Sequence, residues 1–594
     1  MEPTSLGSLP DDLLLDIVEQ LRTAHDAASL SASSSRTHAF MLQRGWRTFV
    51  KARFPTLDIP SNETTQWNRV ADRLTYLDRC WDKRGIFLNF FTEQGQPRHG
   101  RRARPGGQSV PFHPVVHARL LEPSDDELVA WGVGEDLVVR RRSGDGKSAD
   151  EWNRIRGQSG GYAAGSGDVT AVAVVERHHQ PQVVVGRAMG NLELLSLDKD
   201  TFGQQGQSLT LHHPSGVSPG KQAVTWVDWQ DHGSLLASCR GSQLMLYDVA
   251  DSHRRELDPV ALFDASEQAS TGTPGNEDPF LRCARFLSGD VVACALGGSR
   301  DPLRWIKIQP TGFTPLHGAA TPRDASEDVK KTTVRAIHPV APGYNETLLL
   351  SAWDDGSYRL FDSRTPSHAD AVYRDRFQPY QAGSSLLVYG RERFVAGSNH
   401  SPDLRLFDFR QPKSYHHFDG LSCPDALPYS SAGGQGQAPT AAAGAPERCD
   451  DQRGAACSWH ARTRHDDWRP DATLHIGSYA IYDRVFSLAK ASDASSTFYC
   501  GLQGAVVEAN LMLGEHATAE NTKRTVPPGW EVGPVQGRIS LQETGVARCK
   551  DGELAHDGII GIQRLWHQKH HRHPQNRLVR PSAHNPLDSS FYNT

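Results

Sequence analysis

A short β-pattern that recurs along most of the chain constrains its fold more than any other sequence feature. Each copy has one apolar run, a second apolar run that ends in small residues, a tight turn and a third run. The clearest third runs are 191–198, 243–248, 357–362 and 403–408, and weaker copies lie at 136–140, 303–307 and 505–509. Their spacing of about 40–55 residues, apart from one long interruption, predicts seven structural repeats.

Repeats of this kind need one another for stability. A small sheet of three or four strands cannot bury both of its faces alone, whereas sheets stacked around an axis bury the faces between neighbours. Composition agrees, because 53 Gly and 36 Pro make this 594-residue chain rich in turns and unsuited to a helical bundle. We therefore predict a mainly β fold, a seven-bladed β-propeller over residues 112–513.

The predicted propeller lacks one strand. The seventh unit contains only three strand-forming runs, within 484–511. Segment 86–91, Ile-Phe-Leu-Asn-Phe-Phe, precedes the first unit and is apolar on both faces. We predict that it completes the last blade, because a ring of sheets is weakest where its first and last members meet. The competing segments are 538–541 and 558–562.

Several segments interrupt or follow the repeats. Polar insertions occur at 253–279 and 309–332, and the composition of 421–470 is that of a disordered loop. Residues 514–594 are a C-terminal extension whose tail we expect to be largely disordered. No metal or other cofactor is predicted. The long loop contains a Cys/His group whose spacing is not that of a standard zinc finger: Cys449, Cys457, His460 and His465.

Residues 1–54 have a helical pattern instead. Apolar residues recur at helical spacing after Asp11 and Asp12, which suit the positive end of a helix dipole. Two more helices are predicted at 26–33 and 36–51, and residues 55–111 hold a linker helix at 62–85, the closing strand and a basic loop. Three helices make a core too small to be stable alone, so we expect a partner to cover the exposed apolar side chains.

The repeats resemble those of the WD-repeat family, and the first 54 residues resemble an F-box. Residues 353–362, Trp-Asp-Asp-Gly-Ser-Tyr-Arg-Leu-Phe-Asp, are similar to the turn-and-strand signature of WD repeats. The F-box similarity is carried by Leu9, Pro10, Leu13, Leu14, Ile17, Leu21, Arg36, Phe40 and Trp46.

Together the two resemblances imply an F-box/WD-repeat protein. Such a protein is a non-catalytic substrate receptor of an SCF-type ubiquitin ligase. Its F-box binds the adaptor subunit and, through it, a cullin, and its propeller binds the target protein. The resemblance implies that the adaptor-binding residues are Leu9, Pro10, Leu13, Leu14, Ile17 and Leu21. The alternative is a WD-repeat interaction scaffold with no role in ubiquitin transfer.

The turns between second and third runs are the predicted target-binding region. In a propeller these turns converge on one rim of the axis, and three consecutive units carry an arginine there. A guanidinium group matches two oxygens of a carboxylate or phosphate at once, so we expect an acidic or phosphorylated target. The predicted target-binding residues are Arg187, Arg240, Arg300, Trp353 and His400.

Other function classes find little support in the sequence. Residues 157–161 match Gly-x-Ser-x-Gly but lack the strand and helix that a catalytic serine elbow needs. A net charge of -5 does not suit a chain that coats nucleic acid or an anionic membrane. Nine scattered cysteines and an N-terminus unlike a signal peptide favour a cytoplasmic or nuclear location.

Overall fold

The computed structural model describes most of the helical region and the propeller. The described residues are 6–59, 66–82, 85–93, 102–103, 109–110, 112–121, 124–144, 149–177, 180–197, 208–212, 223–230, 234–250, 256–266, 279–310, 312–316, 331–340, 347–365, 369–375, 381–410, 472–476, 484–513, 526 and 530–532. The predicted insertion at 421–470 and the competing strands at 538–541 and 558–562 lie outside these residues.

The N-terminal region is a small helical unit. Its elements are η1 (Leu6–Ser8), α1 (Asp11–Gln20), α2 (Ala24–Ala32), α3 (Ser35–Phe40), the π-helical turn η2 (Met41–Gly45) and α4 (Trp46–Arg53). Capping boxes start α2 at Thr23 and α3 at Ser34, where each side chain accepts a hydrogen bond from a free backbone N–H. The segments α3, η2 and α4 follow one another directly and replace the single third helix that the sequence predicts.

Helix α5 (Trp67–Asp82) connects the helical unit to the propeller. It packs on α4 and α2, and Trp81 near its end stacks on Phe498 of the last blade with ring centroids 6.1 Å apart. Buried side chains of the helical unit, α5 and the last two blades form one continuous hydrophobic cluster. The helical unit is therefore joined to the propeller by a shared core.

Seven sheets, each with a four-stranded antiparallel core, make up the propeller, one per predicted repeat. The first three are β4 (Val116–Leu121), β5 (Asp126–Val133), β6 (Asp136–Arg142), β7 (Glu151–Ile155); β8 (Val169–Arg177), β9 (Gln180–Arg187), β10 (Leu192–Ser196), β11 (Ser208–Leu211); and β12 (Val224–Trp229), β13 (Leu235–Arg240), β14 (Gln243–Asp248), β16 (Ala261–Asp264).

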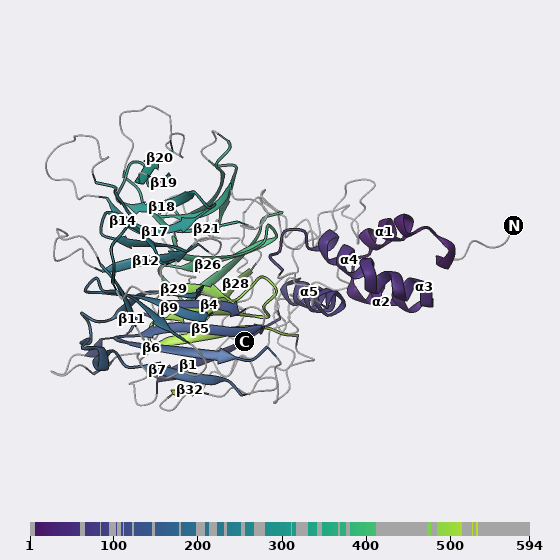
Figure 1. Cartoon of the computed structure of the whole chain (residues 1–594), viewed down its shortest axis with the longest axis horizontal. Coiled ribbons are helices and arrows are strands. Elements are labelled where there is room, and N and C mark those ends of the chain that lie inside the picture. Colours follow the sequence, from purple (N-terminus) through teal and green to yellow (C-terminus); the bar gives the residue numbers. More distant parts are fainter. Residues whose placement is uncertain are drawn as a thin grey trace, which may run out of the picture.

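The next three blades have the same order of strands. They are β17 (Phe280–Phe286), β18 (Val291–Gly297), β19 (Leu303–Gln309), β20 (Gly312–Pro315); β21 (Val334–Pro339), β22 (Leu348–Trp353), β23 (Ser357–Asp362), β24 (Ala371–Arg374); and β25 (Gly383–Tyr389), β26 (Arg393–Ser398), β27 (Asp403–Asp408), β28 (Ala472–His475). The first strand of every blade contacts the first strands of its two neighbours, and β29 of the seventh blade contacts β4. The innermost strands thus form a closed ring, to one side of which the helices lie (Figure 1).

The seventh blade is built from both ends of the described chain. It contains β29 (Val485–Lys490), β30 (Thr497–Leu502), β31 (Ala505–Leu511) and then β1 (Ile86–Glu93). Strand β1 pairs antiparallel with β31 from Ile86 opposite Leu511 to Thr92 opposite Ala505. The prediction that residues 86–91 complete the last blade is confirmed.

Some strands occur where the sequence predicts none. The insertions at 253–279 and 309–332 contain the fourth strands β16 and β20, and the extension after 513 contains β32 (Trp530–Val532), which pairs with the outer edge of β1. Strand β15 (Glu256–Leu257) pairs in parallel with β11. Two further strands, β2 (Arg102–Ala103) and β3 (Ser109–Val110), pair within the predicted basic loop. Each of these six strands has four residues or fewer, which is too short to show an alternating pattern.

Candidate functional site

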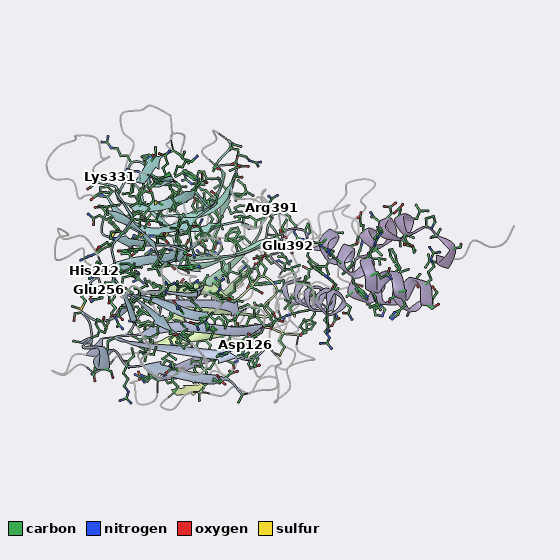
Figure 2. All side chains as sticks on the ribbon, in the orientation of Figure 1. Asp126, His212, Glu256, Lys331, Arg391 and Glu392 are labelled. Atoms are coloured by element: carbon green, nitrogen blue, oxygen red, sulfur yellow. The ribbon has the colours of Figure 1, made fainter. Side chains whose placement is uncertain are left out.

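The propeller has two faces with different surroundings. We call the end that carries the turns between second and third strands the upper face, and the opposite end the lower face. The helical unit lies against the lower face, where the backbone N–H of Arg391 donates to Thr56 Oγ1 at 2.9 Å. Figure 2 shows Arg391 and Glu392 on the side toward the helices and His212, Glu256 and Lys331 on the opposite side.

Ion pairs and close packing fix this joint. Arg393 Nη2 lies 2.6 Å from Asp78 Oδ1 of α5, and its guanidinium group lies 5.5 Å from the ring centroid of Trp81. Gly390 has a φ of 51° and a Cβ there would come within 2.7 Å of Thr56 O, so glycine is required for the close approach. The backbone N–H of Asp58 donates to Asp493 Oδ2 at 2.8 Å.

On the helical unit, the predicted adaptor-binding residues separate into exposed and internal ones. Leu13 is 48% exposed and Pro10 is exposed, whereas Leu14 is completely buried. Leu9, Ile17 and Leu21 are partly buried against the core. Leu14 therefore belongs to the interior of the helical unit.

The sequence pattern does not indicate a second exposed leucine, Leu42. Leu42 is 61% exposed and lies in the π-helical turn η2, which contacts α1. A π-turn inserts one extra residue into a helix and rotates the following side chains, so ordinary helical spacing does not reveal which residue faces outward. Leu13 and Leu42 are the large apolar side chains that α1 and η2 expose among the described residues.

On the upper face, two of the predicted target-binding residues are internal. Arg187 is 3% exposed, and its Nη1 donates to the backbone oxygens of Glu135 and Gly167 at 2.8 Å each. Burial lowers the pKa of Arg187 to about 10. Trp353 is also 3% exposed, and its Nε1 donates to Ser351 Oγ at 2.8 Å. Both side chains are buried and hydrogen-bonded inside the propeller, which argues against a role in target binding. That role stays a prediction.

The other three predicted residues are accessible. Arg240 is half-buried, and burial lowers its pKa. Arg300 and His400 are exposed in the turns of the fourth and sixth blades. Nothing in the described contacts brings Arg240, Arg300 and His400 together on a single point. Their role in target binding also stays a prediction.

Three further arginines lie at the upper ends of the innermost strands. Arg282 and Arg335 occupy equivalent positions in β17 and β21, where an extra residue makes a β-bulge against the second strand. Arg484 directly precedes β29. Burial and the positive charge of Arg335 lower the pKa of Arg282, and Arg484 adds to this effect. Arg335 and Arg484 are therefore each near enough to Arg282 to act on its charge.

The bulge position has a different occupant in other blades. Thr170 Oγ1 donates to Val224 O of the next blade at 2.7 Å, and Thr225 Oγ1 donates to Leu281 O at 3.1 Å. Ser384 makes the same kind of bond to Val485 O. In the fourth and fifth blades the position holds arginine, which makes no such bond among the described residues. Arg282 and Arg335 become visible in the sequence when the first strands of the blades, instead of the turns, are aligned with one another.

The local contacts of these arginines leave donors available. Arg335 pairs with Asp354, while the guanidinium groups of Arg282 and Arg484 lie 4.5 Å from the ring centroids of Phe280 and Phe486. The Nε–H groups of Arg282 and Arg484 have no hydrogen-bond partner among the described residues. A group of three arginines with one carboxylate nearby carries a net positive charge, which attracts carboxylates and phosphates.

Within the part of the chain that the structure describes, no cluster of His, Cys, Asp and Glu has a metal-binding arrangement. No helix in that part has the length and apolar character needed to cross a membrane.

Similar proteins are found among solved structures. No protein-family model matches the chain, and no curated protein matches its sequence. One similar structure is that of U3-55K, which is 14% identical, covers 71% of this chain and 98% of its own, and has a TM-score of 0.40. Another is the crystal structure of the RRP9 WD40 repeats, at 13% identity, 68% and 99% coverage and a TM-score of 0.38. The closed ring of seven sheets itself defines the chain as a seven-bladed β-propeller protein.

Proposed function

We propose that this chain is a non-catalytic protein-interaction subunit that holds two other proteins at a fixed separation. The observation that carries the proposal is the opposed placement of two surfaces. The helical unit exposes Leu13 and Leu42 beyond the lower face, and the upper face carries Arg282, Arg335 and Arg484. The shared core and the Arg393–Asp78 ion pair keep the helical unit in place relative to the blades.

The more specific form of the proposal is a substrate receptor of an SCF-type ubiquitin ligase. Its support is the F-box resemblance of residues 9–46 together with the exposed leucines on α1 and η2. In this form the helical unit binds the adaptor, and through it a cullin, and the upper face binds a target protein. The function is then proximity: it raises the effective concentration of a target lysine near a ubiquitin-loaded enzyme.

The proposed target has an acidic or phosphorylated segment. Arg335 and Arg484 both act on the charge of Arg282, and Arg282 and Arg335 lie on first strands of the inner ring. Forked guanidinium donors on a rigid support bind an anion with little loss of conformational freedom. Each charge-assisted contact contributes about 1.5–3 kcal/mol, so loss of two of them weakens capture by over a hundredfold.

An interaction scaffold without a ubiquitin-ligase role is the alternative, and co-purification separates the two forms. The full chain, expressed in cells, is captured and its bound adaptor and cullin are measured. Leu13→Asp with Leu42→Asp is the test variant, and Leu262→Asp is the matched control, because Leu262 on the outer strand β16 is 46% exposed. Burial of one leucine contributes about 1.5–3 kcal/mol, so the double variant is expected to lose the adaptor.

The receptor form predicts that the wild type and Leu262→Asp retain adaptor and cullin equally. A wild-type chain that captures neither protein contradicts the receptor form and leaves the scaffold form. Adaptor binding at wild-type strength by the double variant contradicts the assignment of the docking surface to α1 and η2.

A further inference from the structure

The outermost strand of the seventh blade contributes little backbone pairing. Strand β32 pairs antiparallel with the outer edge of β1 through three residues, from Phe91 opposite Val532 to Glu93 opposite Trp530 (Figure 1). The other edge of β1 pairs with β31 through seven residues. Residues 512–529 separate β31 from β32 along the chain. Ordering so short a strand costs conformational entropy that three paired residues hardly offset, so we expect a side chain to hold it.

Trp530 is the side chain that holds β32. It is 2% exposed, and its ring centroid lies 6.0 Å from that of Trp131 in the first blade. Trp131 packs edge-to-face on Trp152 of β7, and Trp152 packs on Phe91 of β1, with ring centroids 5.7 Å apart in both pairs. We call Phe91, Trp131 and Trp152 the aromatic slot. One ring from β32 thus enters a slot formed by the seventh and first blades.

The walls of the aromatic slot are joined to each other by contacts that do not involve β32. Arg154 Nη1 of β7 lies 2.8 Å from Glu93 Oε1 of β1, and Arg140 Nη1 of β6 lies 3.0 Å from Glu508 Oε2 of β31. The Arg140–Glu508 pair is buried, so solvent screens it little. Because these ion pairs connect the first blade to the seventh directly, we expect the slot to keep its shape when β32 detaches.

The aromatic slot interacts with the apolar ring of Trp530 and leaves its polar atom unpaired. The Nε1–H groups of Trp131, Trp152 and Trp530 have no hydrogen-bond partner among the described residues. A buried donor without a partner is unfavourable, so the stabilising contribution of Trp530 comes from its apolar area and its edge-to-face contact. Phenylalanine has an aromatic ring without the donor. The slot therefore suits aromatic side chains as a class.

We propose that the outer edge of β1 and the aromatic slot form a strand-addition site for another protein, and that β32 occupies this site as a detachable strand of the same chain. The partner is an extended segment with an aromatic residue opposite Glu93. Backbone hydrogen bonds to β1 give such a segment its affinity, and the slot selects its side chain. The tethered β32 competes with the partner through its high effective concentration. This inference does not depend on the proposed function.

The test uses the full-length chain and a fluorescent peptide with the sequence of residues 524–535. Trp530→Ala in the chain removes the ring that holds β32 and leaves the site open. The peptide is expected to bind this variant about a hundredfold more tightly than it binds the wild type. In the peptide itself, Trp530→Ala is expected to abolish binding and Trp530→Phe to preserve it. Trp305→Ala in the chain, which removes a buried indole from the fourth blade, is the matched control and is expected to bind the peptide as the wild type does.

Amide exchange gives a second readout, which also applies to the wild type. Saturating peptide is expected to slow exchange in β1 of Trp530→Ala, and in the wild type β32 is expected to exchange roughly tenfold faster than β31, as a strand that opens on its own. Equal protection of β31 and β32 in the wild type overturns the inference, because β32 is then a fixed part of the blade. Equal binding of the peptide to the wild type and Trp530→Ala, or no binding to either, also overturns it.

Discussion

At the scale of single residues, Arg282 and Arg335 occupy positions where other blades use a hydroxyl group to hold the next blade. Thr170 and Thr225 donate to backbone oxygens of their neighbours across the inner ring. An arginine at this position gives up that bond and takes on repulsion from nearby positive charge, which contributes to the lowered pKa of Arg282. A residue that costs stability in a structural position is typical of a binding site.

Replacing both arginines by threonine tests this trade-off. Arg282→Thr with Arg335→Thr is expected to restore two hydrogen bonds worth about 0.5–1.5 kcal/mol each. The variant also loses the partly exposed Arg335–Asp354 ion pair, worth about 0–1 kcal/mol, so the midpoint of thermal unfolding is expected to rise slightly. Capture of a phosphorylated target is expected to fall by over a hundredfold. Calorimetry and a capture assay measure the two effects. A variant that is less stable than the wild type contradicts the structural part of the argument.

Two adjacent leucines in α1 are expected to behave differently. Leu14 is completely buried, so Leu14→Ala is expected to destabilise the helical unit by about 2–5 kcal/mol. Leu13 is half-exposed, so Leu13→Ala is expected to change its stability by no more than about 0.5 kcal/mol. Amide exchange in α1 to α4 measures both. Equal effects would contradict the separation of the two side chains into core and surface.

At the scale of elements, strand β1 has paired neighbours on both edges. It lies between β31 and β32, and Trp530 of β32 packs against Trp131 of the first blade with ring centroids 6.0 Å apart. A three-residue ion-pair group lies at the same junction: Glu508 of β31 is completely buried and accepts from Arg140 at 3.0 Å and Arg142 at 2.7 Å. The point where the ring closes is thus reinforced by both packing and charge.

Removing Trp530 is expected to loosen this closure in a localised way. Trp530→Ala should cost about 3–5 kcal/mol of local stability, because it leaves a cavity beside Trp131. Amide exchange is expected to accelerate in β1 and β32 and to stay unchanged in β21 to β24. The matched change Trp305→Ala, in the fourth blade, is expected to accelerate amide exchange in β21 to β24 and to leave it unchanged in β1 and β32. Uniform acceleration in both variants would contradict a local role for β32.

The sequence predicts most of this element arrangement but only part of the candidate site. Third strands such as 357–362 and the closing strand 86–91 are visible because their apolar residues are numerous and regularly placed. Strands β16, β20 and β32 are too short to show a period. The sequence pattern does not reveal Arg282 and Arg335, because the β-bulge adds a residue and breaks the alternation that shows which side chains share a position.

At the scale of the whole molecule, the distance between the two surfaces depends on the joint at the lower face. Arg393→Ala removes the ion pair with Asp78 and the contact with Trp81. The variant is expected to broaden the distribution of distances between spin labels on α1 and on the propeller. Arg391→Ala is the control, because Arg391 contacts Thr56 through its backbone N–H. An unchanged distribution in Arg393→Ala would show that the shared core alone keeps the joint rigid.

The seventh blade also sets an order of events during synthesis. Strand β1 leaves the ribosome about four hundred residues before β31, so at about 5–20 residues per second it waits roughly 20–80 s for its partner. During that time an apolar strand has both edges open to wrong pairing. Until β31 is made, the nascent chain carries an apolar strand without this partner, and any truncation before residue 505 leaves the helical unit attached to a strand that lacks this partner permanently.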